Sequence, residues 1–449
     1  MSISRKIYRV ERLGINGEGI SHDNGLTVFI PFALPNEQVE ARIIESKKNY
    51  SVANLEKILE PSSERIEPMC KKFPACGGCQ LQHLDYDSQL KFKRQMIVDS
   101  VQRIGKISNV EILPTLGMND PTRYRNKFQF PVGIKDRRLI IGCYARNSHD
   151  IIDNNECLIQ KIENDLLANA IREAVEKYRV PIYDEDKHSG ILRHVMGRVG
   201  INGELMAVFV TAKKDLPHAK EISKILRERV PKLRSIQQNF QPQHNNVILG
   251  RDTKILWGKD SITDKIGQFE FQISARSFFQ VNTSQAEILY KKVLEFADLT
   301  GNEVVIDAYC GTGTISIFLA RHARKVFGIE IVSSAIIDAK KNARTNKIHN
   351  VEFFTGDANF LSQKLFHEEI HPDVIVVDPP RAGCDESVLK VFARMKPEKI
   401  IYVSCNPATL ARDLNLLDSL DYVTQKIQPV DMFPFTAHVE SVSLITRRR

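Results

Sequence analysis

The chain has 449 residues, which at roughly 150 residues per domain predicts about three domains. The chain has 42% hydrophobic and 26% charged residues, a mean hydropathy of −0.25 and no run of roughly 18 apolar residues. These values exclude disordered, fibrous and membrane-embedded proteins. The start MSISRKIYRV lacks the apolar core of a secretion signal. A net charge of +8, from 63 Lys and Arg against 55 Asp and Glu, favours a polyanionic partner.

Residues 1–60 alternate apolar and polar positions in short runs. The runs YRVERL, LTVFIPFAL and QVEARIIES are separated by the turn-forming sequences NGEG and HDNG. This pattern predicts a small antiparallel barrel of the OB type. Residues 61–85 contain Pro61, Pro68 and Pro74 and are expected to form a tether with little regular structure.

Residues 86–260 mix helical and strand-like patterns, which predicts a central α+β domain. The apolar spacing between residues 86 and 104 fits an amphipathic helix. After it, strand-like runs such as NKFQFPVGI and ELMAVFVTA alternate with helical runs such as KIENDLLANAIREAVEKY.

A basic and aromatic stretch covers residues 121–146 of this central domain. It holds seven Lys and Arg residues against one acid, Asp136. The cations are Arg123, Arg125, Lys127, Lys135, Arg137, Arg138 and Arg146, and the interleaved aromatic residues are Tyr124, Phe128, Phe130 and Tyr144. Because cations neutralise phosphates and aromatic faces stack on unpaired bases, the stretch predicts binding of RNA or single-stranded DNA, with a solvated strand face as the alternative. On the first interpretation, Arg123→Ala and Arg125→Ala weaken RNA binding.

Residues 261–449 alternate apolar strands with helices, from EVVIDAYC and TISIFLARHA to KIIYVSC and ATLARDLNLLDS. Such alternation predicts a Rossmann-like α/β domain with a mostly parallel sheet covered on both faces. Ligands bind at the carboxyl ends of the strands in such sheets, so we expect the chemistry there.

The turn from Asp307 to Thr314, DAYCGTGT, follows a strand and opens a helix, and Glu330 ends the next strand 23 residues after Asp307. An acid at that place can accept both hydroxyls of a ribose. The G-x-G-x-x-G pattern is incomplete because Ser316 stands at its last position, which favours S-adenosylmethionine over NAD. Asp357 and Asp378 follow the next two strands and are further candidates for cofactor contacts, although each motif could be an ordinary turn.

Cys405 follows the fifth strand and precedes a helix, a position that favours a thiolate. An inert buried cysteine is the alternative. Glu440 precedes the final strand and could be a general base or a surface carboxylate. Together they predict one reaction: the thiolate adds to C6 of a uracil, C5 attacks a sulfonium methyl group, and Glu440 removes the C5 proton so that the thiol can leave.

These motifs resemble those of the RNA uracil-5 methyltransferases. The resemblance rests on FFQVN at residues 278–282, the DAYCGTGT turn, DPPRAG, SCNP and the HVE ending, and it extends over nearly the whole chain. It implies that Cys405 is the nucleophile and Glu440 the base, and that the N-terminal barrel is a TRAM domain. The S-adenosylmethionine contacts that it implies are Gln280, Tyr309, Glu330 and Asp378, with Asp357 as a less secure addition. Thr314 stands where some relatives have asparagine, so no role is transferred to it.

Eight cysteines in a chain without a signal peptide point to a reducing compartment and to few or no disulfides. Cys70, Cys76 and Cys79 lie close together, and the resemblance implies that they form an iron–sulfur site of the 23S rRNA branch. The distant fourth ligand is Cys143 or Cys157, with Cys157 preferred for its NNEC context. Four thiolates can also hold zinc, but the uneven spacing favours a structural [4Fe-4S] cluster.

The sequence thus predicts a cytoplasmic, monomeric S-adenosylmethionine-dependent methyltransferase that modifies carbon 5 of a uridine in 23S rRNA and has no membrane partner. A tRNA uridine-5 methyltransferase is one alternative. A non-catalytic RNA-binding or ribosome-assembly protein is another, but it leaves Cys405 and Glu440 without a purpose. An amino-methyltransferase that uses the DPPR motif is the third, and it would keep its activity after Cys405→Ala.

Overall fold

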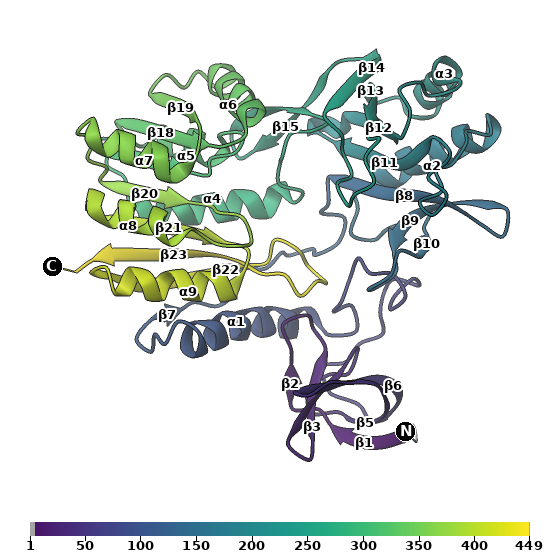
Figure 1. Cartoon of the computed structure of the whole chain (residues 1–449), viewed down its shortest axis with the longest axis horizontal. Coiled ribbons are helices and arrows are strands. Elements are labelled where there is room, and N and C mark those ends of the chain that lie inside the picture. Colours follow the sequence, from purple (N-terminus) through teal and green to yellow (C-terminus); the bar gives the residue numbers. More distant parts are fainter. Residues whose placement is uncertain (1–4, 449) are drawn as a thin grey trace.

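The computed structural model describes residues 5–448. Figure 1 shows a small β domain at the N-terminus, a central domain of strands and helices, and a larger α/β domain that carries the C-terminus. Within the described residues, no helix combines the length and the apolar character that a membrane crossing requires.

The N-terminal domain is a six-stranded sheet in the order β1-β5-β6-β4-β3-β2, in which only β4 and β6 pair in parallel. Its alternating apolar side chains, among them Tyr8, Val28, Ile30 and Val39, form a core of their own. The strands are β1 (Arg5–Arg9), β2 (Arg12–Leu13), β3 (Gly19–Asp23), β4 (Leu26–Ile30), β5 (Gln38–Ser46) and β6 (Tyr50–Glu60). Residues 61–85, which follow, contain turns and isolated bridges but no helix or strand.

The predicted helix at 86–104 is confirmed as α1 (Tyr86–Arg103). It packs on the C-terminal domain, because Ile97 and Val101 enter the same core as Leu410 and Leu414 of α9 (Pro407–Asp418). The short strand β7 (Glu111–Ile112) also joins the C-terminal sheet, parallel to β22 (Tyr422–Val430). Residues 86–112, which the sequence pattern groups with the central domain, therefore lie against the C-terminal one.

The central domain contains a seven-stranded sheet in the order β10-β9-β8-β11-β12-β13-β14, in which β12 and β13 pair in parallel. Helices α2 and α3 pack against each other, and their apolar faces share one core with the sheet. The elements are β8 (Lys127–Lys135), β9 (Arg138–Tyr144), β10 (Ile151–Asp153), α2 (Ile162–Lys177), β11 (Leu192–Val199), the 3-10 turn at Ile201–Gly203, β12 (Leu205–Thr211), α3 (Ala219–Arg229), β13 (Leu233–Phe240) and β14 (Asp252–Gly258).

The C-terminal domain is the predicted Rossmann-like unit, with an eight-stranded sheet in the order β19-β18-β17-β20-β21-β23-β22-β7. Its central strands are buried on both faces, as parallel strands between two helical layers are. Helices α4, α5 and α6 contribute to one core and α7, α8 and α9 to the other (Figure 1). The elements not yet given are β15 (Ser261–Ile266), β16 (Phe269–Ser274), α4 (Thr283–Ala297), β17 (Val304–Ala308), α5 (Thr314–Ala320), β18 (Lys325–Glu330), α6 (Ser333–Thr345), β19 (Val351–Thr355), α7 (Ala358–His367), β20 (Val374–Val377), α8 (Glu386–Met395), β21 (Lys399–Ser404) and β23 (Glu440–Arg447).

Candidate active site

The carboxyl ends of β17, β18, β20 and β21 border a cavity of about 1040 Å³. Strands β17 and β20 are neighbours although β18 and β19 lie between them in the chain, so the cavity sits where the strand order reverses, the usual ligand site of open parallel sheets. The residues predicted from the sequence that line it are Gln280, Tyr309, Glu330, Asp378, Cys405 and Glu440. The central domain supplies another wall through Gln237, Arg251, Thr253 and Ile255.

The turn after β17 brings backbone close to this cavity. Tyr309, Gly311 and Gly313 all have left-handed backbone, with φ of +66°, +54° and +77°. A Cβ on Gly313 would lie 2.8 Å from the Phe353 ring, so this position requires glycine. A Cβ on Gly311 would meet nothing within 4 Å, which leaves that backbone accessible to a ligand.

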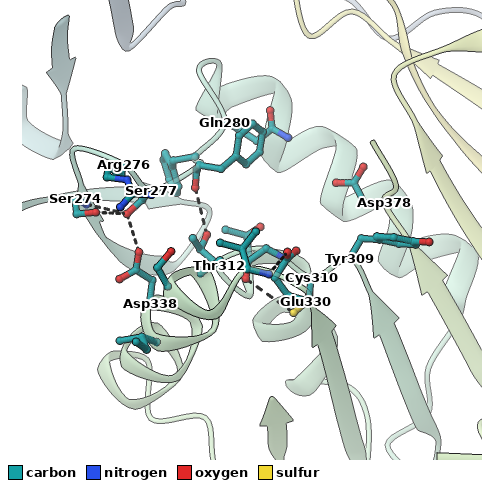
Figure 2. A pocket seen from close by; sticks show the side chains of 18 of the residues that line it. Ser274, Arg276, Ser277, Gln280, Tyr309, Cys310, Thr312, Glu330, Asp338 and Asp378 are labelled. Carbon is teal, nitrogen blue, oxygen red and sulfur yellow. Dashed lines mark hydrogen bonds between the residues drawn. The ribbon is translucent and has the colours of Figure 1, made fainter. Parts of the chain in front are cut away.

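Glu330, at the end of β18, is held by two backbone groups. One carboxylate oxygen accepts a hydrogen bond from the N–H of Gly311 at 3.1 Å, and the other accepts from Val332 at 2.8 Å. Figure 2 shows the side chain beside the turn at the floor of the cavity. The carboxylate is therefore fixed in orientation, and each oxygen keeps acceptor capacity for a ligand.

Gln280 connects the cavity to the central domain. It is 7% exposed, and its backbone carbonyl accepts a hydrogen bond from Asn126 Nδ2 at 3.0 Å. The same amide nitrogen donates to Asp264 at 3.1 Å. Figure 2 shows Gln280, Tyr309 and Asp378 around the cavity, each from a different segment of the chain.

The other acids of the motif region lie elsewhere. Asp357 is exposed and accepts a hydrogen bond from the Phe360 N–H at 3.0 Å, which caps the start of α7, and it is not among the residues that line the cavity. Asp307 is fully buried below the turn, where Ser316 donates to it. Asp307 therefore stabilises the glycine turn from beneath.

Cys405 and Glu440 face each other because of the strand pairing. Strands β21 and β23 are antiparallel, and Ser404 is paired with Ser441. The next positions, Cys405 and Glu440, are thus opposite each other at the end of the ladder. Asp378 follows β20, the neighbour of β21, and lies at the same edge.

Burial dominates the electrostatics of these three groups. It raises the pKa of Glu440 to about 8 and that of Asp378 to about 7. Burial also raises the pKa of Cys405 to about 11, and the two carboxyl groups add to this rise while Arg381 opposes it. The expectation that the helix N-terminus favours a thiolate is wrong for this structure, because burial and nearby acids outweigh the effect of α9.

A second cavity, of about 780 Å³, meets the first at Cys405 and Arg381, which line both. Every region of the chain contributes to it. Its lining includes Ile15 and Asn16 of the N-terminal domain, Gly77 and Gln80 of the cysteine segment, Gln129, Tyr144 and His194 of the central domain, and His438. Arg381 stands in the DPPRAG motif but received no role from the sequence; only its position between the cavities distinguishes it.

Two family models match the chain. The model of the tRNA (uracil-5-)-methyltransferase family matches residues 208–448, more than half of the chain. The chain belongs to this family. The TRAM domain model matches residues 9–55, which confirms the identity expected for the N-terminal domain.

Relatives agree with this family membership. An uncharacterized RNA methyltransferase of Halalkalibacterium halodurans is 50% identical over 437 residues, covering 97% of this chain and 95% of that protein. An uncharacterized RNA methyltransferase of Clostridium tetani is 51% identical over 435 residues, with 97% and 94% covered. The solved tRNA (uracil-54, C5)-methyltransferase of Pyrococcus abyssi, in complex with S-adenosyl-L-homocysteine, has a TM-score of 0.79 and 30% identity, covering 98% of this chain and 99% of that one.

In this RNA uracil-5 methyltransferase family member, Cys70, Cys76, Cys79, Cys143 and Cys157 all line one cavity of about 300 Å³. The neighbouring Cys143 thiol lowers the pKa of Cys76 to about 6. Both candidates for the fourth ligand, Cys143 and Cys157, thus line the same cavity as the other three cysteines. However, no group of three or more His, Cys, Asp or Glu side chains within residues 5–448 is arranged to hold a metal ion. The donor atoms suit iron or zinc, but their positions do not support the expected cluster.

The basic and aromatic stretch of this methyltransferase is largely structural. Tyr124, Phe128 and Phe130 are at most 5% exposed. The expectation that these rings stack on bases is wrong, because every second residue from 124 to 130 points into the protein core. Tyr144 is partly exposed and lines the second cavity. The exposed cations gather at the β8–β9 hairpin: Lys135, Arg137 and Arg138.

Arg123 holds the loop that carries Cys157. Its guanidinium donates to the Asp165 carboxylate at 2.6 Å and to the Cys157 carbonyl at 2.9 Å. We expect Arg123→Ala to lower the free energy of unfolding by about 1–3 kcal/mol, because a half-buried carboxylate loses its partner. Urea denaturation measures this change. Lys135→Ala is the matched control, since that side chain is exposed, and equal stability of both variants would contradict the prediction.

Proposed function

We propose that this protein methylates carbon 5 of a uridine in 23S rRNA, with S-adenosylmethionine as the methyl donor. The observation that carries the proposal is that Cys405 and Glu440, the positions next to the paired Ser404 and Ser441, line the same cavity, and that Cys405 also lines the second one. One cavity suits the cofactor at the switch point of the sheet, and the other is lined by the RNA-binding regions. A nucleophile at their junction can reach a base from one side while the methyl group arrives from the other.

In the proposed reaction, the Cys405 thiolate adds to C6 of the uracil, which makes C5 nucleophilic. C5 would then take the methyl group from S-adenosylmethionine as the methyl–sulfur bond breaks, and S-adenosylhomocysteine would leave. Glu440 then accepts the proton from C5. The electron pair of the C5–H bond re-forms the C5–C6 double bond, and the bond from C6 to sulfur breaks. A carboxyl group with a pKa of about 8 suits this task near neutral pH.

The Cys405 thiol must lose its proton before it can add to the base. Arg381 lines both cavities and opposes the rise in the Cys405 pKa. We assign to Arg381 the role of favouring the thiolate, together with the positive sulfonium of the cofactor. An opposite charge within about 4–6 Å lowers a thiol pKa.

The cofactor contacts follow from the first cavity. Glu330, held by two N–H groups, would accept the ribose hydroxyls, and Gln280, Tyr309 and Asp378 would line the rest of the cofactor site. Asp357 is the least supported member of the set, because its carboxylate caps α7.

Two classes of RNA are candidates for the substrate. The resemblance of the cysteine spacing to the 23S rRNA branch supports the ribosomal target, which would place the enzyme in the cytoplasm. We further propose that the enzyme acts as a monomer. The Pyrococcus abyssi relative, which covers 98% of this chain, is a tRNA (uracil-54, C5)-methyltransferase, and this favours tRNA as the second candidate.

Mapping 5-methyluridine in 23S rRNA and tRNA from a deletion strain tests the target. We expect one or more 5-methyluridines to disappear from 23S rRNA and to return when purified protein and S-adenosylmethionine are added to the unmodified RNA. Loss confined to tRNA would transfer the function to tRNA. A product methylated on an exocyclic amine, or no product from either RNA, would contradict uridine-5 methylation.

We also propose that Cys70, Cys76, Cys79 and Cys157 bind an iron–sulfur cluster that supports the cysteine segment and takes no part in methyl transfer. What supports the proposal is that all four cysteines line one cavity, although the described residues do not arrange them as metal ligands. Anaerobically purified protein is expected to be brown, with about four irons per chain, and Cys76→Ser is expected to lose the iron. Cys384→Ser, which alters a cysteine outside that cavity, is the control. Colourless protein with stoichiometric zinc would contradict the cluster.

A further inference from the structure

Loop 431–439 joins β22 to β23 and leads directly into Glu440. Val430 and Glu440 are paired across this hairpin, so the loop closes beside the proposed base. Most of the loop is buried; Phe433 is partly exposed and His438 is exposed. Irregular backbone in the interior must find hydrogen-bond partners elsewhere in the protein.

Five successive carbonyls of this loop, from Asp431 to Phe435, accept hydrogen bonds from other parts of the chain. The donors are Gln285 to Asp431 at 2.9 Å, Asn282 to Met432 at 3.1 Å, Lys93 to Phe433 at 3.0 Å, Tyr124 to Pro434 at 3.1 Å, and the N–H groups of Gln80 and Leu81 to Phe435 at 2.9 Å each. They come from α4, α1, the segment before β8 and the cysteine segment. The conformation of the loop therefore depends on these tertiary contacts as well as on its local hydrogen bonds, such as that from the Thr436 hydroxyl to the Phe433 carbonyl.

An ion pair lies at the start of the loop. The Lys93 Nζ is 2.5 Å from the Asp431 carboxylate, and both side chains are fully buried. The Tyr86 hydroxyl donates to the other carboxylate oxygen at 2.9 Å. A buried ion pair contributes little to stability compared with apolar residues of the same shape, because both charges lose their hydration. Its place beside Glu440 points instead to a role in geometry.

We propose that Lys93 and Asp431 are positioning residues that hold Glu440 opposite Cys405. The proposal rests on the function proposed above, in which the C5 proton passes to Glu440 and the electrons of the C5–H bond expel the Cys405 sulfur. Without the ion pair, loop 431–439 shifts and moves the carboxylate. A misplacement of about 1 Å can slow such a step about 100-fold. The addition step, which needs only Cys405, is retained.

The test uses the double variant Lys93→Met and Asp431→Leu in the full-length protein, which replaces the ion pair by apolar side chains of similar shape. We expect a folded protein with a lower melting temperature, because the Tyr86 hydroxyl and the Phe433 backbone lose their bonds to the ion pair. Turnover on RNA is expected to fall about 10- to 100-fold, with unchanged KM for RNA and unchanged affinity for S-adenosylmethionine. With a labelled methyl group, a protein–RNA adduct that survives denaturation should accumulate. A merely structural role would lower the active fraction without raising the adduct.

Two further variants, Lys364→Met and Glu440→Gln, distinguish failure of the positioning role from failure of the proposed function. Lys364→Met removes an exposed ion pair with Glu368, 3.7 Å apart on α7, and is expected to behave as the wild type. Glu440→Gln shows whether an adduct forms when the base is lost; without one, the proposed function itself fails. The positioning role alone would be overturned if Glu440→Gln formed an adduct while the double variant formed no adduct and kept the wild-type turnover. Should the double variant not fold, Tyr86→Phe removes a hydroxyl that donates to Asp431 and accepts from the Met118 N–H. Accumulation of the adduct in this variant would support the positioning role, and its absence would overturn it.

Discussion

Replacing Glu440 by glutamine is expected to leave the methylated RNA covalently attached to the enzyme. The side chain keeps its shape, but the neutral amide cannot accept the C5 proton, so the bond between C6 and the Cys405 sulfur persists. Incubation with RNA and S-adenosylmethionine that carries a labelled methyl group should give a shifted, labelled protein band on a denaturing gel. Release of free 5-methyluridine at the wild-type rate would show that another group is the base, and Asp378 would be the next candidate.

Cys405→Ala should fail differently. Without a nucleophile C5 is never activated, so we expect neither adduct nor methylated product, and a rate loss in the range of about 10³- to 10⁶-fold that removal of a covalent nucleophile causes in other enzymes. The comparison is Cys384→Ala, which removes a buried thiol outside the first cavity that contacts Tyr309; this variant is expected to keep adduct formation and to change at most the affinity for S-adenosylmethionine. An adduct with Cys405→Ala would assign the nucleophile elsewhere.

The affinity for S-adenosylmethionine is expected to fall as the pH falls, and more steeply than the affinity for S-adenosylhomocysteine. Asp378 and Glu440 have pKa values of about 7 and about 8, so they are charged above this range and neutral below it. Only the charged forms attract the sulfonium, which the product lacks. Between about pH 9 and about pH 6 the ratio of the two affinities should fall about 10- to 100-fold, since one pKa unit corresponds to a factor of ten.

Isothermal titration calorimetry across this pH range measures both affinities. The ratio cancels the titration of the amino group, which both ligands carry. Asp378→Asn should flatten the pH dependence of the ratio. Glu330→Gln is the matched control. It alters the end of the cavity assigned to the ribose, so it should lower the affinity for both ligands by the same factor. Parallel pH curves for the two ligands in the wild type would contradict a sulfonium beside these carboxyl groups.

Much of the site could be predicted because its residues stand in local motifs. Tyr309, Glu330 and Asp378 each follow a strand of the parallel sheet, and strand ends meet at one edge whatever the loop lengths. Asp357 follows a strand by the same rule, yet its carboxylate turns to the first N–H groups of α7. A pattern in the chain locates the residue but leaves the direction of its side chain undecided.

The wrong expectations about side-chain exposure and about the Cys405 pKa have one physical cause, which is that both properties depend on tertiary contacts. The spacing of Tyr124, Phe128 and Phe130 among cations is the same whether the rings face solvent or core. Only tertiary packing buries them, Phe128 and Phe130 in the core of the central domain and Tyr124 in a cluster with Phe435. The pKa of Cys405 follows from the acids and the burial around it, which outweigh its place before a helix. The five thiols of one cavity come from segments about Cys70, Cys143 and Cys157 that the fold alone assembles.

The sequence by itself determined the order of the domains, the Rossmann-like sheet and the edge at which Cys405 lies, because apolar periodicity and glycine turns act between near neighbours in the chain. Tertiary structure alone placed Glu440 opposite Cys405, since the register of β21 against β23 pairs Ser404 with Ser441, 37 residues further along the chain. It also decided that Lys93, 338 residues before Asp431 in the chain, forms the ion pair beside the proposed base. Such contacts depend on the packing of distant elements, and no local pattern encodes them.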